Sequence, residues 1–312
     1  MPELAEVEAY RRLAEARALN RQIAAVVAED QWYLKGGLTA PAARAALEGR
    51  SLTHAGRQGK LLLLTTSDDG PMLGLRFGMS GRLLVDSVAG VDDLWYASNR
   101  DNERWDRFVL EFVDGGRLAM RDPRRLGGVT LDPPLGRLGP DALTVTLNEL
   151  RNALAPGRVN RPAAAAGPAD PEAPADPSAA AAGPADPAAP ADPAGPADPG
   201  ATSGLTTRMS LKGRLMDQSR VAGVGNLAAD EILWRAGLDP TRPAGSLTDT
   251  ELRRLHRHIR ATLRLLLERG GSHTGELMSE RRPGGVCPKD GNPLRRATVA
   301  TRTTWWCPKH QH

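Results

Sequence analysis

The 312-residue sequence predicts an α+β multidomain fold, in which a helix-led antiparallel β-sandwich precedes a helical domain and a C-terminal β-hairpin. Three observations lead to this prediction. Apolar residues recur at helical spacing in the first 13 residues, and short strand-like runs separated by turns follow between residues 51 and 131. Helical periodicity then returns after residue 205 and ends in a hairpin-like segment with a cysteine near each end.

The N-terminal segment is expected to be an amphipathic helix. An i, i+3 series of apolar residues forms one face: Leu4, Val7, Tyr10 and Leu13. Pro2 can occupy the first turn, where its missing N–H costs nothing. Glu3 and Glu6 are three residues apart and should project from the same side of that turn.

The sandwich is predicted from short runs of apolar and β-branched residues. Strands are expected over 61–66, 72–77 and 82–87. The run from Arg107 to Asp122 contains two further strands, which we expect to be joined by a turn at Asp114-Gly115-Gly116. Strands that follow one another this closely predict a mainly antiparallel arrangement.

The second half of the chain should be helical apart from one tract of biased composition. Residues 162–204 contain almost only Ala, Pro, Gly and Asp, so they cannot build a core and should form an extended, disordered linker. Helices are expected at 147–155, 211–220 and 227–237, with the glycine turn GVGN at 223–226. A longer helix should begin at Thr248, which forms a capping box with Glu251.

Composition restricts the classes of protein to which the chain can belong. The formal net charge is +4, but the tract 162–204 holds six acids and no base, which leaves 31 acidic against 41 basic residues elsewhere. A basic surface predicts a polyanionic partner, although an arginine-rich genome would give the same composition. Two cysteines are too few for a disulfide scaffold. Because neither a secretory signal nor a membrane-length apolar run is present, we expect a cytoplasmic, nucleoid-associated protein of bacterial type.

Pro2 has two interpretations when it is considered alone. Removal of the initiator methionine would expose a secondary amine with a pKa near about 8, part of which is neutral and nucleophilic at neutral pH. Such an amine can form a Schiff base with a sugar C1′, and Glu3 beside it can act as an acid or base. Taken in isolation, however, a proline followed by acids is more often an ordinary helix start.

Several motifs in register resemble the formamidopyrimidine-DNA glycosylase and endonuclease VIII family. The similarity covers nearly the whole chain except 162–204, and the motifs follow one another in the order found in that family. They are MPELAEVEAYRR (1–12), GRQGKLLLL (57–65), GMSG (78–81), DPRRLG (122–127), LGPDAL (138–143), LKGRLMDQSRVAGVGNLAADEILWRAGLDP (211–240) and RTTWWCPKHQ (302–311). Each motif alone is weak to moderate, whereas seven in register outweigh the interpretation of Pro2 as a simple helix start.

The resemblance implies roles for individual residues. Pro2 would be the Schiff-base nucleophile and Glu3 the general acid, with Glu6 supporting the same site. Lys60 would contact a phosphate and donate a proton during β-elimination, and Arg302 would assist δ-elimination. A second set would contact DNA: Met79, Arg124 and Leu126 in place of the flipped nucleotide, Asn226 at a phosphate-binding helix start, and Lys212 near the DNA backbone.

The C-terminal hairpin matches the zinc finger of that family, with two changes. The pattern Cys287-x2-Asp290-x16-Cys307-x2-His310 keeps the spacing of the family but places Asp and His where two cysteines are usual. Cys, His and Asp can all ligate zinc, so the resemblance implies a structural Zn²⁺ and no organic cofactor. An empty finger held together by packing of Trp305 and Trp306 remains the alternative.

The implied activity is that of a bifunctional DNA glycosylase and abasic-site lyase of base excision repair, acting as a monomer on damaged double-stranded DNA. Only 15 residues separate Gly271 from Cys287, too few for the loop that caps oxidised purines in one branch of the family. This favours an oxidised pyrimidine or an abasic site over 8-oxoguanine. Two alternatives stay open: a non-catalytic damaged-DNA binding protein of the same fold, and an unrelated basic zinc-finger regulator.

The expected domains follow the same order along the chain. They are a catalytic β-sandwich domain at 1–135, a connecting segment at 136–161, the linker at 162–204, a helix–two-turns–helix DNA-binding domain at 205–275 and a zinc-finger-like β-hairpin at 276–312.

Overall fold

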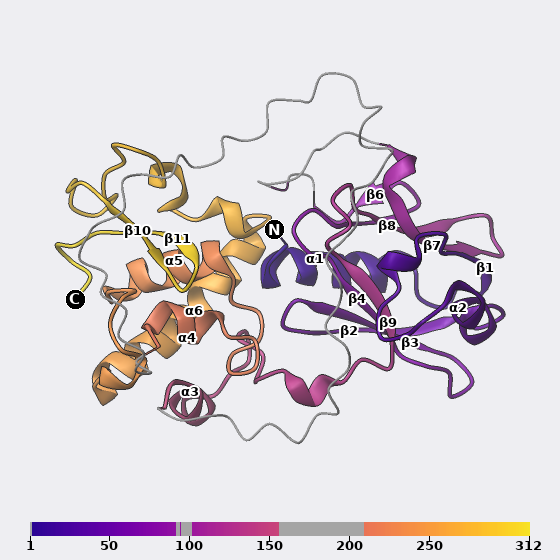
Figure 1. Cartoon of the computed structure of the whole chain (residues 1–312), viewed down its shortest axis with the longest axis horizontal. Coiled ribbons are helices and arrows are strands. Elements are labelled where there is room, and N and C mark those ends of the chain that lie inside the picture. Colours follow the sequence, from indigo (N-terminus) through magenta and orange to yellow (C-terminus); the bar gives the residue numbers. More distant parts are fainter. Residues whose placement is uncertain (1, 92–93, 95–101, 156–208) are drawn as a thin grey trace. The chain divides into compact units, whose positions relative to one another are not determined.

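A computed structural model describes residues 2–91, 94, 102–155 and 209–312 of the chain. The predicted linker at 162–204 lies outside the described residues. Antiparallel sheets occupy the N-terminal half, and helices followed by a two-stranded hairpin occupy the C-terminal half (Figure 1). The α+β fold class predicted from the sequence is thus confirmed.

Two antiparallel sheets form the sandwich. The five-stranded sheet has the order β1 (Ile23–Val27), β7 (Asp106–Phe112), β8 (Arg117–Arg121), β5 (Arg82–Val85) and β6 (Val88–Ala89). The four-stranded sheet has the order β2 (Leu52–Gln58), β3 (Leu61–Thr66), β4 (Leu73–Arg76) and β9 (Gly128–Leu131). Apolar side chains from both sheets bury one common core. The predicted hairpin is β7–β8, and Gly115 adopts the positive φ of +85° that its turn requires.

Short helices complete the sandwich and its margins. These are η1 (Gln31–Tyr33), α2 (Ala40–Leu47), η2 (Glu103–Trp105) and η3 (Leu135–Arg137).

Helix α1 (Leu4–Arg17) belongs to two hydrophobic cores at once. Its first turn, with Leu4 and Ala5, packs into the core of the C-terminal helices. Val7, Tyr10 and Ala14, further along the same helix, pack into the sandwich core. The N-terminus is therefore held by buried contacts on both sides, which restricts the position of every residue in its first turn.

The C-terminal helices surround the second core. They are α3 (Leu147–Leu154), α4 (Leu211–Met216), α5 (Asn226–Ala236) and α6 (Asp249–Glu268), with the short turns η5 (Ala244–Ser246), η6 (Ser272–Thr274) and η7 (Met278–Glu280). The capping box at Thr248 is present, because Thr248 and Glu251 each accept a hydrogen bond from the backbone of the other. Helix α5 ends at Gly237, whose left-handed φ of +64° suits glycine.

The chain ends in the predicted hairpin, formed by β10 (Arg295–Val299) and β11 (Arg302–Trp306). Cys287 precedes the hairpin and Cys307 follows it, and both thiols are buried. Among the helices that the structure describes, none has both the length and the apolar character needed to cross a membrane.

Candidate active site and DNA interface

Pro2 lies at the edge of a cavity. It is buried immediately ahead of α1, whose N-cap is Glu3, so it precedes the helix rather than occupying its first turn as expected. The cavity has a volume of about 250 Å³. Its lining is made by Pro2, Gln58, Lys60, Leu61, Arg76, Phe77, Gly78, Leu138 and Gln218. The fold thus brings Pro2 and Lys60, 58 positions apart in the sequence, to the wall of one cavity.

The Glu3 carboxylate is bound to the N-terminus of helix α5. Only 1% of Glu3 is exposed, and its two carboxylate oxygens accept hydrogen bonds from the backbone N–H groups of Leu227 (3.0 Å) and Ala228 (3.1 Å). A Cβ atom on Gly225 would overlap this carboxylate, so any other residue there would displace Glu3 from its present position. Burial raises the pKa of Glu3, while the nearby charge of Lys60 and the two N–H donors act in the opposite direction. Glu3 can therefore hold a proton at a higher pH than an ordinary glutamate.

Glu6 fixes the first turn of α1 through hydrogen bonds. Its Oε2 accepts a hydrogen bond from the backbone N–H of Glu3 (2.8 Å) and another from the hydroxyl of Ser272 (2.8 Å). Its Oε1 accepts from the backbone N–H of Ser272 (2.5 Å). Glu6 thereby fixes the backbone beside Pro2 and ties it to the segment that follows α6.

Lys60 lies in the tight turn that immediately precedes strand β3. Gly59 in this turn has a φ of +59°, and a Cβ atom there would come within 2.8 Å of the Cβ atom of Ala222. Lys60 itself is half-buried. Burial lowers its pKa, and the positive charge of Arg302 acts in the same direction, whereas Glu3 and Glu6 raise it. A lysine in this environment can release and take up a proton more readily than an exposed one.

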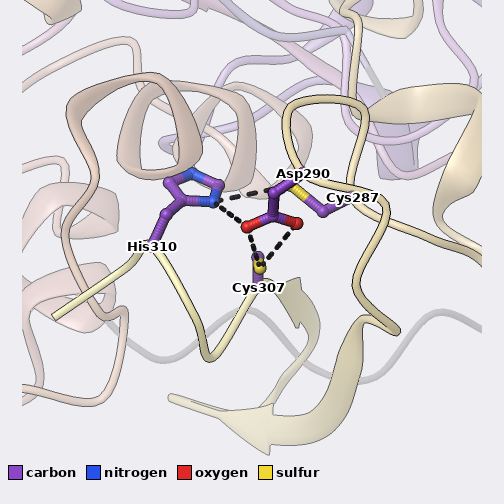
Figure 2. Close-up of side chains that lie close together, drawn as sticks. All are labelled: Cys287, Asp290, Cys307 and His310. Atoms are coloured by element: carbon purple, nitrogen blue, oxygen red, sulfur yellow. Dashed lines mark hydrogen bonds and ion pairs between the residues drawn. The ribbon is translucent and has the colours of Figure 1, made fainter.

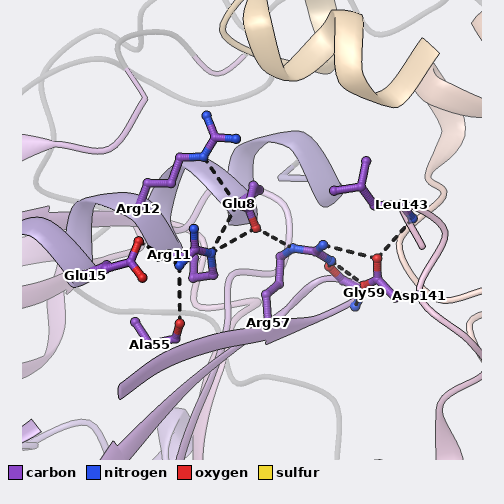
Figure 3. A network of polar contacts seen from close by, with 9 residues as sticks. All are labelled: Glu8, Arg11, Arg12, Glu15, Ala55, Arg57, Gly59, Asp141 and Leu143. Atoms are coloured by element: carbon purple, nitrogen blue, oxygen red, sulfur yellow. Dashed lines mark hydrogen bonds and ion pairs between the residues drawn. The ribbon is translucent and has the colours of Figure 1, made fainter. Parts of the chain in front are cut away.

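A network of charged groups sets the position of the turn before Lys60 (Figure 3). The Asp141 carboxylate forms a two-point ion pair with Arg57 (2.5 and 3.1 Å) and accepts a hydrogen bond from the backbone N–H of Gly59 (2.7 Å). Arg57 also donates to Glu8 on α1 (3.0 Å). The sequence motif LGPDAL marked the place of Asp141 in the chain but gave no sign of this role, because its partner lies 84 positions away.

Replacement of Asp141 tests this network. Asp141→Asn removes one of the ionised partners of the Arg57 guanidinium, which is almost fully buried. We therefore expect the free energy of unfolding to fall by about 1–3 kcal/mol. The matched control is Asp249→Asn, which removes an exposed, solvent-screened ion pair with Arg151 and should lower the stability much less. Urea unfolding followed by circular dichroism measures both losses of stability. Equal losses would show that the buried network stabilises the protein no more than the exposed ion pair does.

Asn226 lies at the start of α5 but is not its N-cap, which is Gly225. The N–H groups of the next two residues are already bound to Glu3, so they are not available to a phosphate as the sequence suggested. Asn226 itself is half-buried, and its Oδ1 atom has no hydrogen-bond partner among the described residues. Its amide is the group that remains for contact with a ligand.

The structure places the two expected wedge loops side by side. A Cβ atom on Gly78 would overlap the backbone of Leu126, so the loops are in direct contact. The buried carboxylate of Asp122 holds them together by accepting hydrogen bonds from the Ser80 hydroxyl (2.5 Å) and from the backbone N–H of Gly127 (2.8 Å). Three side chains are thereby presented near one another on the surface: half-buried Met79 and exposed Arg124 and Leu126.

Lys212 does not lie on the surface. Its side chain has no exposed area, and its ammonium group pairs with Asp230 (2.7 Å) and donates to Thr304 Oγ1 (2.7 Å). Burial lowers the pKa of this lysine, and the Asp230 carboxylate opposes that shift. The expectation that Lys212 binds DNA is therefore wrong for this structure, because a fully buried ammonium cannot reach a phosphate. It instead attaches strand β11 to helices α4 and α5.

Arg302 is exposed at the start of β11. Its positive charge contributes to the lowered pKa of Lys60. The position of the hairpin, and hence of Arg302, depends on the buried Lys212–Asp230 pair and on Arg281, which also binds Asp230 (3.0 Å).

The four predicted metal ligands come together from the segments just before and just after the hairpin (Figure 2). One donor atom from each of Cys287, Asp290, Cys307 and His310 lies within 4.8 Å of the other three. His310 Nε2 must donate to the Trp234 carbonyl (3.1 Å), because a carbonyl can only accept. The lone pair of Nδ1 therefore faces the thiol of Cys287 (3.5 Å). Two thiols, an imidazole nitrogen and a carboxylate in such a cluster fit a tetrahedral metal ion.

Comparison with known proteins gives consistent matches. Residues 1–129 match the family model described as the formamidopyrimidine-DNA glycosylase N-terminal domain, and residues 195–277 match its H2TH domain. The formamidopyrimidine-DNA glycosylase of Paracoccus denitrificans is 31% identical and that of Symbiobacterium thermophilum is 32% identical. The alignments cover 99% of this chain and 99% of the first relative, and 100% of this chain and 89% of the second.

Solved structures show the same fold. Lactococcus lactis Fpg (MutM) in complex with a DNA that contains N7-benzyl-Fapy-dG is similar with a TM-score of 0.70 and 21% identity, over 100% of both chains.

Proposed function

The chain belongs to the formamidopyrimidine-DNA glycosylase family, and on that premise we propose that it is a bifunctional DNA glycosylase and abasic-site lyase of base excision repair. The observation that carries this proposal is the position of Pro2 at one cavity with Lys60, beside the buried carboxyl of Glu3. A protein that only bound DNA would need neither a nucleophile nor an acid with a raised pKa at this place.

In the first step, the secondary amine of Pro2, freed by loss of Met1, attacks C1′ of the damaged nucleotide. The bond between C1′ and the base breaks, and the base leaves with the electron pair. The Glu3 carboxyl supplies the proton that this step needs, because its raised pKa keeps part of it protonated. The Pro2 nitrogen then loses its proton, and its lone pair forms a double bond to C1′ while the C1′–O4′ bond breaks. O4′ keeps the electron pair of that bond and takes up a proton, so the sugar ring is open and an iminium (Schiff base) joins Pro2 to C1′.

In the second step, the iminium draws electrons from the sugar. Loss of a proton from C2′ expels the 3′ phosphate by β-elimination, and a second elimination expels the 5′ phosphate. Water then hydrolyses the iminium and returns Pro2. Lys60, with its lowered pKa, is placed to bind a flanking phosphate and to transfer a proton. Arg302, whose charge acts on Lys60, is the second cation available to a leaving phosphate.

Damaged double-stranded DNA is the proposed partner of the two adjoining loops. Flipping a nucleotide out of the duplex leaves a gap, and the apolar side chains of Met79 and Leu126 offset part of the lost stacking. The exposed guanidinium of Arg124 can donate to the unpaired base opposite. Leu126 is 43% exposed, so its apolar side chain is accessible to such a gap.

We propose an oxidised pyrimidine or an abasic site as the preferred lesion. The segment from Gly271 to Cys287 is short, and it is held to the protein at several points. Ser272 is bound by Glu6, the backbone N–H groups of Glu276 and Leu277 are bound by Glu231, and Met278 is buried. Within the described residues 209–312, this leaves no long loop after α6 to close over a purine.

Borohydride trapping tests the activity. We expect the full-length protein with a free Pro2 to form a covalent adduct with an abasic-site duplex. Duplexes that carry 5-hydroxycytosine or 8-oxoguanine then test the lesion, with faster excision expected for the pyrimidine. Absence of any adduct would refute the lyase activity, and faster release of 8-oxoguanine would refute the proposed lesion preference alone.

A structural Zn²⁺ is the proposed occupant of the cluster at Cys287, Asp290, Cys307 and His310. Purified protein should contain about one zinc per chain, the stoichiometry of a single four-ligand site. Asp290→Cys should retain zinc longer in the presence of a chelator, since thiolate is the softer and stronger ligand, and Asp290→Ala should lose it. Metal analysis during dialysis against chelator measures this order; equal retention by all three proteins would show that Asp290 is not a ligand.

A further inference from the structure

We propose that the exposed face of helix α6 is a second nucleic-acid binding surface, which holds the phosphate backbone of a DNA segment other than the one at the lesion site. Four arginines define this surface, and we call them the α6 arginine row: Arg253, Arg257, Arg260 and Arg264. The proposal goes beyond the proposed glycosylase and lyase activity, which does not use these residues.

The arginine row results from the helical periodicity. The four residues are three or four positions apart, so at about 100° per residue they fall within about 60° of one another around the helix axis. The buried residues of the helix lie on another side: Leu252, Leu255, Ile259, Thr262, Leu263 and Leu266. Arg253, Arg257 and Arg264 are exposed, and Arg260 is half-buried.

The charge of the row is not balanced by neighbouring groups. Between Leu252 and Leu267 the helix contains no acidic residue. Of the four arginines in the row, only Arg253 has an ion pair within the described residues, at 3.5 Å with Asp249. The Asp249 carboxylate already binds Arg151 more closely, at 2.7 Å. Arginines three or four positions apart repel one another, which destabilises the helix. A bound polyanion would remove that cost.

A second observation shows that positive charge continues around the helix, to a position about 100° beyond Arg257. His258 is half-buried there, and burial together with four cations lowers its pKa. The four are Arg257, Lys289, Arg235 and Arg254. Within the described ranges, the Nε atoms of Arg254 and Arg260 and the Nδ1 atom of His258 are buried without a hydrogen-bond partner. The Nε–H groups of Arg254 and Arg260 are thus donors for which the described part of the protein supplies no acceptor.

The dimensions of the row fit a nucleic-acid strand. From Arg253 to Arg264 the helix rises about 16 Å, at about 1.5 Å per residue. One strand of B-DNA places a phosphate every 3.4 Å or so along its axis, so about five phosphates lie over that length. A single small anion would need only one or two of these arginines, whereas a regular row of four matches a repeated charge.

The arginine row is separate from the proposed lesion site. None of its members lines the cavity at Pro2, and among the described residues none forms a hydrogen bond or ion pair with the loops at 78–81 and 122–127. A DNA segment bound there would therefore leave the lesion site free, and the two surfaces could hold two segments at the same time.

Binding of a second duplex tests the proposal. The lesion site is first saturated with a short duplex that contains a tetrahydrofuran abasic analogue, and a fluorescent undamaged duplex is then added to the complex. We expect the full-length protein to bind this second duplex. The triple variant Arg253→Gln, Arg257→Gln and Arg264→Gln should not bind it, while its affinity for the short lesion duplex stays the same. The control is Arg17→Gln, Arg44→Gln and Arg104→Gln, which removes three exposed charges elsewhere.

The salt dependence on undamaged DNA alone gives a second measurement, which does not require lesion binding. Three lost phosphate contacts lower the slope of log affinity against log salt by about 2.7. Between 50 and 200 mM salt, the affinity of the unmodified protein should then fall about 40-fold more than that of the triple variant.

Two results would overturn the proposal. One is equal binding of the second duplex by the triple variant and the control. The other is an equal loss of affinity for the short lesion duplex, which would make the row part of the lesion site. Failure of the proposed glycosylase and lyase activity can be told apart from failure of this proposal. It would appear as a missing covalent adduct, while the salt slopes of the unmodified protein and of the triple variant would still differ as expected.

Discussion

A chain in which residues are retained ahead of Pro2 should form no borohydride-trapped adduct with abasic-site DNA. The Pro2 nitrogen is then an amide, which has no lone pair available for attack on C1′. We expect the rate of strand cleavage to fall by on the order of 10⁶-fold, the scale on which loss of a covalent nucleophile acts. Gel analysis of trapped and cleaved DNA measures both effects.

Two controls separate the amine from the fold. Pro2→Gly, after removal of Met1, keeps an α-amine at the same position, so it should form a reduced but detectable adduct. Affinity of the extended chain for a tetrahydrofuran duplex should remain close to that of the unmodified protein, because the wedge loops and Lys60 are unchanged. A normal adduct from the extended chain would place the nucleophile elsewhere, and Lys60 would then be the next amine at the same cavity.

Glu3→Gln should have the second largest effect, a fall of about 10²–10⁴-fold in the rate of base excision, the usual contribution of a general acid. The glutamine oxygen can keep only one of the two hydrogen bonds from Leu227 and Ala228, so we expect the protein to fold with a lower stability, which thermal unfolding measures. Cleavage of DNA that already contains an abasic site should be much less affected, because no base has to leave. Single-turnover kinetics on a damaged-base duplex and an abasic duplex measure the two rates.

The pH profile gives the same test another readout. Because burial raises the pKa of Glu3, its carboxyl stays protonated to a higher pH than a free glutamate, and excision should slow as the pH rises through that pKa. In Glu3→Gln this limb of the profile should disappear. Glu15→Gln, at a half-exposed position on the same helix, is the matched control and should leave both the rate and the profile unchanged. An unaltered profile in Glu3→Gln would assign the proton to another group.

Local sequence patterns determined the elements that carry the site. The helical spacing of Leu4, Val7 and Tyr10 predicted α1, and the strand at 61–66 was predicted with the bounds that β3 has. The Thr248–Glu251 capping box and the C-terminal hairpin are also confirmed. These features depend on residues close together in the chain, whose preferences act within a turn of helix or a single strand. The family could be recognised for the same reason, since its motifs are short and contiguous.

The tertiary structure alone decided how charged side chains are used. Lys212 was expected at the DNA and is instead buried against Asp230. The N–H groups at the start of α5 were expected to bind phosphate and instead bind Glu3, which lies 224 positions earlier in the chain. Likewise, no local pattern indicated that Asp141 holds the turn before Lys60. A charge can be exposed, paired or used in catalysis with the same neighbours in sequence, because its environment is set by segments that meet only when the two cores pack against α1.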